Sequence, residues 1–278
     1  MSFADRLRGA WNIFKLALSL LKKNRSLIIV PITIVFLPII ILVLCLLIFI
    51  KSLIIIFGSS WKETILPYLS TVSFAGAILF VLFIIFLITF LESVQVWMVY
   101  EVLKKGKTSI SSGFERAFKN FWDITAFTFT TISFTAFSFF LRSEGGKVGQ
   151  TTANVMDYLT SLAGKLVLPA MIITERNFKE AIKQLKESTI ALPEIAAYEI
   201  GIRPLIFFLL ILGGFISITI FIFMTWVFNF WGGGFFFAFP FLIFWILMVI
   251  LLSIYVNETY YTILYVKLIE KQKIKKLI

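Results

Sequence analysis

Six long runs of apolar residues constrain what this chain can fold into more than any other feature of its sequence. They cover approximately residues 27–50, 72–99, 122–141, 154–174, 202–230 and 235–268. A membrane-spanning helix needs roughly 20 apolar residues to cross a hydrocarbon core about 30 Å thick. Hydrophobic residues make up 60% of the chain, which is more than a soluble domain can bury. We therefore predict an all-α, multi-pass membrane protein with about six transmembrane helices.

Three amphipathic segments divide these runs into pairs. They lie at residues 3–23, 110–121 and 177–192, and each places apolar residues at helical spacing beside basic ones. The order amphipathic helix, span, span predicts a single transmembrane domain, residues 1–278, built from three hairpins. The hairpins cover about residues 1–105, 106–175 and 176–278. Their mutual similarity is faint, so true internal repetition and coincidence both remain open.

Basic residues gather at one set of span ends. The chain has 26 Lys and Arg against 15 Asp and Glu, a formal charge of +11. Most of these bases lie in or beside the amphipathic segments, and few lie at the opposite ends of the spans. The positive-inside rule then predicts a multi-pass protein of the cell membrane with both termini in the cytoplasm. The charge needs no nucleic acid to explain it, and it predicts contact with anionic lipid headgroups.

The first apolar run is longer than the apolar core of a signal peptide and follows a basic amphipathic segment, so we expect the N-terminal segment to be retained. A protein partner or a homo-oligomer is compatible with the sequence, which indicates neither.

Residue types on which many enzymes and metal sites depend are scarce. The chain has no histidine, the commonest general base and metal ligand, and Cys45 is its single cysteine. We therefore expect no catalytic residue, no metal site and no cofactor, and we expect Cys45 to serve as a small apolar side chain.

Ionisable residues occur inside the apolar runs. Lys165 lies about eleven residues into a run of roughly twenty, where an unpaired ammonium costs at least about 2.5 kcal/mol. Glu92 and Glu258 lie in spans of the other two hairpins and could approach Lys165 in a closed bundle. We hypothesise an intramembrane ionic network of these three residues. The alternative is that Lys165 extends to a membrane interface and the glutamates lie near headgroups.

A stripe of hydroxyl residues follows one face of the third span. Its members are Thr125, Thr128, Thr131, Thr135 and Ser138, at spacings of three and four. Such a stripe either packs against neighbouring helices or lines a polar path. We expect packing, because small hydroxyl side chains favour close helix contacts.

Glycine and proline residues predict local features in three spans. Gly232, Gly233 and Gly234 predict a tight turn between the last two spans, while Pro31 and Pro38 predict kinks in the first. Gly213 and Ser217 form a small-xxx-small pair that predicts helix packing.

Two parts of the sequence resemble a known family. Residues 168–188 (LPAMIITERNFKEAIKQLKES) run from a span into an amphipathic helix, and the N-terminal part carries Phe3, Trp11, Phe14, Leu21, Lys22 and Pro31. This pattern resembles a family of uncharacterised six-helix prokaryotic membrane proteins and, remotely, the membrane region of some glycerophosphodiester phosphodiesterases. Those phosphodiesterases carry catalysis on a separate barrel that this chain lacks, so the resemblance implies no activity here. The layout is also loosely similar to that of sulfate permeases.

Three classes of function fit these observations. A non-enzymatic role in organising or assisting something at the membrane is the leading interpretation, because no motif indicates a reaction. The alternative is a transporter or channel for a small solute or ion, which the hydroxyl stripe and the ionisable residues inside spans would serve. A lipid-handling membrane enzyme is the weaker alternative.

Overall fold

The structure is a computed structural model that describes residues 3–57, 61–186, 197–198, 200–201, 203–228 and 231–268. Nearly all of these residues are helical, and none of them is in a strand. In chain order the elements are α1 (Phe3–Lys23), the 3₁₀ turn η1 (Arg25–Ile28), α2 (Ile29–Phe57), α3 (Trp61–Lys105), α4 (Ile110–Lys119), α5 (Phe121–Glu144), α6 (Gly146–Thr174), α7 (Phe178–Lys186), α9 (Arg203–Phe228) and α10 (Trp231–Leu268). The predicted all-α class is confirmed for this part of the chain.

Five of the described helices are long and apolar enough to cross a membrane. The candidate spans are Arg25–Ile48, Gly76–Lys105, Phe121–Glu144, Pro204–Phe228 and Gly234–Lys267. Each has at least the roughly 20 residues that a bilayer requires. The protein is therefore a helical, multi-pass membrane protein.

The sixth expected span falls on α6, which differs from the others. The helix has 29 residues and begins with the polar segment GKVGQTTANVMD, and the apolar stretch found within its described side chains is Lys165–Thr174. The prediction of six spans consequently stays a prediction, and α6 is the helix on which it depends.

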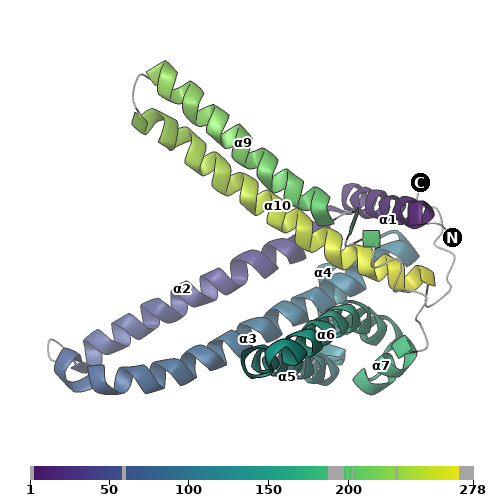
Figure 1. Cartoon of the computed structure of the whole chain (residues 1–278), viewed down its shortest axis with the longest axis horizontal. Coiled ribbons are helices and arrows are strands. Elements are labelled where there is room, and N and C mark those ends of the chain that lie inside the picture. The colour runs from purple at the N-terminus through teal and green to yellow at the C-terminus, as the bar shows by residue number, and fades with distance from the viewer. Residues whose placement is uncertain are drawn as a thin grey trace.

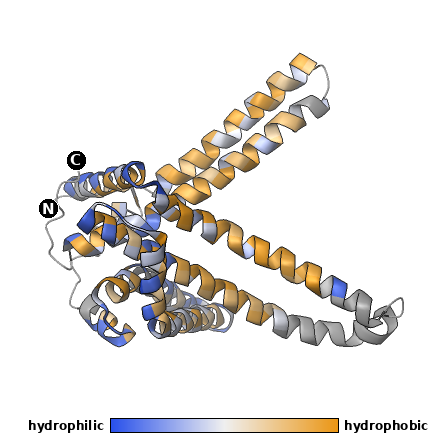
Figure 2. Ribbon diagram, turned by 180° about the vertical axis from the view of Figure 1, so that it is seen from behind, coloured by the Kyte–Doolittle hydropathy of each residue, from blue (hydrophilic) through white to orange (hydrophobic). Residues whose placement is uncertain are grey.

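The long helices form two arms that diverge from a common junction (Figure 1). Helices α2 and α3 form one arm, and α9 and the first part of α10 form the other. Helices α5 and α6 pack side by side next to α3. The short helices α1, α4 and α7 lie on the side where the arms meet. Figure 2 shows hydrophobic residues along both arms and hydrophilic ones gathered on these short helices.

The core lies at the junction. The largest fully buried side chains include Tyr255, Tyr260, Tyr261 and Tyr265 of α10, together with Met98 of α3 and Met171 of α6. The Tyr255 hydroxyl donates a hydrogen bond to the Ala17 carbonyl at 2.8 Å, which ties α10 to α1. Helices α1, α3, α6 and α10, from distant parts of the sequence, thus contribute to one buried core.

The glycine cluster has a different role from the one expected. Gly232, Gly233 and Gly234 do not form the turn, because α10 already begins at Trp231 and includes all three. A Cβ at Gly234 would overlap the Thr225 hydroxyl and would lie 2.7 Å from the Phe221 carbonyl oxygen. The prediction of a glycine turn was wrong. Gly234 instead allows the start of α10 to approach α9.

Small residues also allow close packing farther along the second arm, as expected. Gly213 is buried against the Trp245 indole, whose Nε1 donates to the Leu209 carbonyl at 2.8 Å. The Ser217 hydroxyl donates to the Ala238 carbonyl at 2.9 Å. Both members of the small-residue pair therefore serve helix packing.

The positions of α1, α2, α4 and α7 agree closely with the segments expected from the sequence. Pro31 lies in the first turn of α2, where it removes no hydrogen bond of the helix, and Pro38 lies within the helix. The amphipathic segments at 3–23 and 110–121 correspond to α1 and α4. Helix α7 matches the third segment as far as Lys186, and the remainder of that segment lies outside the described residues.

Candidate functional site

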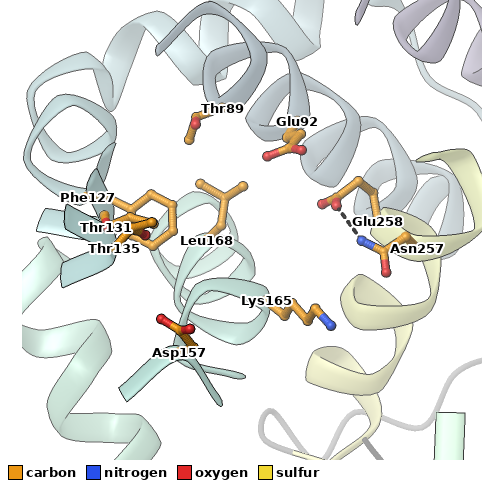
Figure 3. A pocket seen from close by; sticks show the side chains of 10 residues that line it. All are labelled: Thr89, Glu92, Phe127, Thr131, Thr135, Asp157, Lys165, Leu168, Asn257 and Glu258. Carbon is orange, nitrogen blue, oxygen red and sulfur yellow. Dashed lines mark hydrogen bonds between the residues drawn. The ribbon is translucent and has the colours of Figure 1, made fainter. Parts of the chain in front are cut away.

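A polar pocket of about 460 Å³ lies where α3, α5, α6 and α10 meet (Figure 3). Its lining residues are Thr89, Glu92, Phe127, Thr131, Thr135, Asp157, Lys165, Leu168, Asn257 and Glu258. All three members of the predicted ionic network and two members of the hydroxyl stripe are among them. Residues from separate hairpins of the sequence are thus brought to one site.

Helix α3 contributes Glu92 and Thr89 to the pocket. The Thr89 hydroxyl donates to the Ile85 carbonyl of its own helix at 3.0 Å, which leaves its methyl group to pack. Glu92 is half-buried, and within the described residues its carboxylate accepts no hydrogen bond and forms no ion pair. An ionised carboxylate in an apolar span is costly without such partners. Glu92 is therefore the least satisfied charged group of the site.

Helix α10 contributes Glu258 and Asn257. The Asn257 amide donates to the Glu258 carboxylate at 3.1 Å. Tyr255 lies one turn before Glu258 on α10. Its carbonyl accepts a hydrogen bond from Nε2 of Gln95 on α3 at 3.3 Å. This bond joins α3 and α10 one helical turn away from both glutamates, and Figure 3 shows Glu92 and Glu258 projecting into the same space.

Helix α6 contributes Lys165 and Asp157. The Lys165 ammonium lies 5.0 Å from the centroid of the Tyr261 ring, and its charge acts favourably on Glu258. Asp157 forms an ion pair with Arg142 of α5 at the other end of the pocket. The structure therefore places Lys165 beside α10, in the same pocket as Glu92 and Glu258. A direct ion pair of Lys165 with either glutamate stays a prediction.

The hydroxyl stripe divides into packed and pocket-lining members. Thr125 and Thr128 donate to the carbonyls of Phe121 and Ile124, each at 2.8 Å, and Thr128 is buried. The Ser138 hydroxyl is buried and donates to Ala153 of α6 at 3.3 Å. Thr128 and Ser138 are buried as expected, and Thr125 is half-buried.

The two remaining threonines lie differently. Thr131 is half-buried and Thr135 is exposed, and both line the pocket. The expectation that the whole stripe is buried was therefore wrong at Thr135. The reason is geometric: Ser138 at one end of the stripe contacts α6, whereas Thr131 and Thr135 face the pocket.

Arg116 of α4 is a structural residue that the sequence did not single out. Its side chain is only 8% exposed, and it donates from Nε to the Ile172 carbonyl at 2.6 Å and from Nη2 to the Ile173 carbonyl at 3.2 Å. It also pairs with Glu175 and lies 4.4 Å from the centroid of the Trp97 ring. Arg116 thereby fixes the C-terminal end of α6, the helix that carries Lys165.

Glu175 completes this attachment outside the spans. It has a left-handed φ of 57° and ends α6. Hydrogen bonds from the Lys119 ammonium at 3.0 Å and from the Arg116 guanidinium hold the pKa of Glu175 below its usual value. The attachment is therefore ionised at neutral pH.

Sequence reasoning identified Lys165, Glu92 and Glu258 but did not single out the other lining residues Asp157, Asn257, Thr89, Leu168 and Phe127. Asn257 could have been noticed, because it is a lone amide next to Glu258 in an apolar run. Thr89 lies three residues before Glu92, on the same face of α3. No comparable signal distinguishes Phe127 from the chain's 33 phenylalanines.

No family model, no curated protein and no solved structure matches this chain. The resemblance to six-helix prokaryotic membrane proteins consequently stays a prediction.

Proposed function

We propose that this protein binds a small polar or charged solute or ion in the pocket between α3, α5, α6 and α10 and provides a path for it across the membrane. The observation that supports this most is the convergence of Glu92, Lys165 and Glu258 on one cavity among apolar helices. Placing ionisable groups within membrane spans costs free energy, and such groups usually mark the path of a substrate or ion. Helix packing alone does not require them.

The shape of the pocket supports binding rather than packing alone. Its volume of about 460 Å³ is within the range of small-molecule sites. One wall carries the Thr131 and Thr135 hydroxyls, and the others carry carboxylates, an amide and an ammonium. Phe127 and Leu168 add apolar surface. The proposal involves no reaction, no metal and no cofactor.

The orientation we propose has the short helices α1, α4 and α7 at the cytoplasmic face of the cell membrane, both termini in the cytoplasm, and α6 as a sixth span. Exposed Trp11 and Lys15 of α1 support it, with the Lys15 ammonium 5.6 Å from the Trp11 ring centroid. An aromatic ring beside a base suits the headgroup region, and nearby Arg8 and Lys22 suit anionic lipid.

A second function is favoured by a different observation. Helix α9 and the first part of α10 contact mainly each other and leave large apolar side chains exposed, including Phe215, Ile222 and Phe236. This surface suits lipid, and it equally suits a membrane-embedded partner or a second copy. Non-enzymatic membrane organisation is therefore the competing proposal.

Cysteine accessibility separates the two functions. With Cys45→Ser as background, the chain contains no other cysteine, so single cysteines can be introduced by Thr131→Cys and Thr135→Cys. Thr130→Cys is the control on the same helix, because Thr130 lies outside this pocket and lines a separate hollow among phenylalanine side chains, where a charged reagent is not expected to enter. Each variant is treated in proteoliposomes with a charged, membrane-impermeant methanethiosulfonate, added to one side at a time.

Transport predicts that the two pocket cysteines react, that Thr130→Cys does not, and that the pocket is reached from both sides of the membrane across the set of variants. If no pocket cysteine reacts from either side, the pocket is dry and the organising role is the better proposal.

A further inference from the structure

We propose that Glu92 and Glu258 form a proton-binding pair: together they hold one proton, taken from and returned to water in the pocket. The binding site itself is independent of the transport function. The consequence that solute passage is coupled to proton movement rests on the function proposed above.

The charges of the pocket lining lead to this inference. The charged groups that line the pocket together with Glu92 are Glu258 from α10 and Lys165 and Asp157 from α6, while α5 contributes only the uncharged Phe127, Thr131 and Thr135. Asp157 is already paired with Arg142. Lys165 compensates one of the two glutamates, so one negative charge among apolar helices remains without a counter-charge. A single proton removes it.

The geometry of the two carboxylates agrees with a shared proton. Glu92 and Glu258 project into the pocket from opposing helices and interact electrostatically with each other (Figure 3). Two carboxylates that face each other in apolar surroundings cannot both stay ionised without a compensating positive charge. The contacts of the two residues differ: Glu258 accepts from Asn257 and is attracted by Lys165, whereas Glu92 has neither contact. Glu92 is thus the member on which the proton resides.

A buried acceptor beside the pair points independently to an exchangeable proton. Gln95 lies one turn after Glu92 on α3 and is 0% exposed. Its amide nitrogen donates to Tyr255, but its Oε1 accepts no hydrogen bond from any described residue. A buried acceptor of this kind normally has a donor. Gln95 is one helical turn from Glu92, so a protonated carboxyl of the pair, or a water molecule bound to it, is the donor that the proposal assigns to this acceptor.

A proton fits the site better than a metal cation does. Among the described residues no group of three or more Asp, Glu, His or Cys side chains is arranged to hold a metal ion. A hard cation needs about six oxygen ligands, whereas a proton needs one carboxylate and one acceptor.

The test is infrared difference spectroscopy of the purified full-length protein in detergent at neutral pH, with exchange from H₂O to D₂O to identify protonated carboxyl groups. The wild type should show one carboxylic acid C=O band. Glu92→Gln should abolish it, and Glu115→Gln, which changes an exposed glutamate on α4, should leave it intact. Lys165→Met should enlarge the band at the same pH, because it removes the ammonium that attracts Glu258. A wild-type spectrum without the band, or a band that survives in both Glu92→Gln and Glu258→Gln, overturns the proposal.

A chemical readout on the unaltered chain avoids dependence on the folding of variants. Dicyclohexylcarbodiimide adds to protonated carboxyl groups in apolar surroundings and leaves ionised ones unmodified. Mass spectrometry of the treated wild type should locate the adduct on Glu92 or Glu258 and not on exposed Glu115 or Glu180. Absence of an adduct from both pocket glutamates overturns the proton site.

The two proposals fail separately. A dry pocket in the cysteine experiment together with a carboxylic acid band removes transport and keeps the proton site. Labelled pocket cysteines without a band or an adduct keep the path and remove the proton.

Discussion

The first and last parts of α10 pack against the rest of the protein through different kinds of contact. Toward its start, α10 packs on α9 through shape: Gly213 accommodates the Trp245 indole, and Gly234 accommodates α9. Toward its end, α10 meets α3 at Tyr255, whose carbonyl accepts a hydrogen bond from Gln95, and meets α6 at Tyr261, whose ring lies 5.0 Å from the Lys165 ammonium. Within a bilayer apolar surface provides little drive for helix association, so helices join through close packing or through polar contacts. The arm combines close packing with two hydrogen bonds between α9 and α10, from Trp245 and Ser217, whereas the junction adds charged side chains to its packed core.

The largest loss of stability should come from a bulky substitution at the close contact between α9 and α10. Gly213→Leu places a side chain where the Trp245 indole lies, so α9 and α10 have to separate. We expect a loss of about 3 kcal/mol in unfolding free energy, at the upper end for overpacked cores. The measurement is SDS-induced unfolding in mixed micelles.

Gly214→Leu is the control for this substitution, because a Cβ at Gly214 meets nothing within 4 Å. Dicyclohexylcarbodiimide labelling of the pocket should be unchanged in both variants. Equal losses for Gly213→Leu and Gly214→Leu would show that shape does not hold the arm.

A smaller loss should follow from removing the attachment of α6. Arg116→Met deletes the donors to the Ile172 and Ile173 carbonyls, and we expect a cost of about 2 kcal/mol, since bonds to charged groups contribute more than neutral ones. Lys119→Met is the control. It removes an exposed partner of Glu175, and exposed ion pairs contribute little to stability.

Arg116→Met should also change the labelling of Thr135→Cys, because α6 carries the opposite wall of the pocket. Unaltered labelling would mean that the pocket wall is held by other contacts.

The electrostatic interaction between Lys165 and Glu258 should contribute less to stability than the contacts of Arg116. In a double-mutant cycle of Lys165→Met and Glu258→Gln, we expect a coupling of about 1 kcal/mol, within the range for residues in one polar network. The double variant should then regain part of the stability that Lys165→Met loses. Glu115→Gln in place of Glu258→Gln should give additive effects, and additivity in both cycles would remove the contact.

The smallest effect concerns Glu175 and pH. Its pKa in the folded protein lies below the ordinary value of 4.5, so ionised Glu175 stabilises the folded state. This contribution is complete above the unfolded pKa and is lost as the pH falls through the folded pKa. The stability difference between wild type and Glu175→Gln should therefore be constant near pH 7 and shrink below about pH 4.5. A difference that is the same at all pH values would show that the carboxylate does not act through its charge.

Much of the fold could be predicted from the sequence, because membrane spans are determined by local composition. The apolar runs located α2, α3, α5, α9 and α10, and the amphipathic segments located α1 and α4. Composition did not resolve α6, whose first half is polar. It also misplaced the last turn, because glycine permits a turn and close packing equally well.

The pocket was predicted in part. Lys165, Glu92 and Glu258 stood out because charges are rare in spans, and that rarity is itself a local signal. Arg116 gave no such signal. It is one of 26 bases, and its burial depends on carbonyls 56 and 57 residues away in the sequence. Exposure of Thr135 likewise depends on how α6 crosses α5, which no local pattern encodes.

The length of α3 has a mechanical consequence. Its 45 residues make a continuous helix about 68 Å long, roughly twice the thickness of the hydrocarbon core. Such a rod cannot fit inside the bilayer upright, so it tilts steeply or emerges from it. Glu92 lies nearer the C-terminal end of α3, close to the part of the helix that packs against α4, α6 and α10. A rotation of α3 by a few degrees about this point would displace its far end by several ångströms, so a small change at the pocket would be a large one at the distal end of the arm.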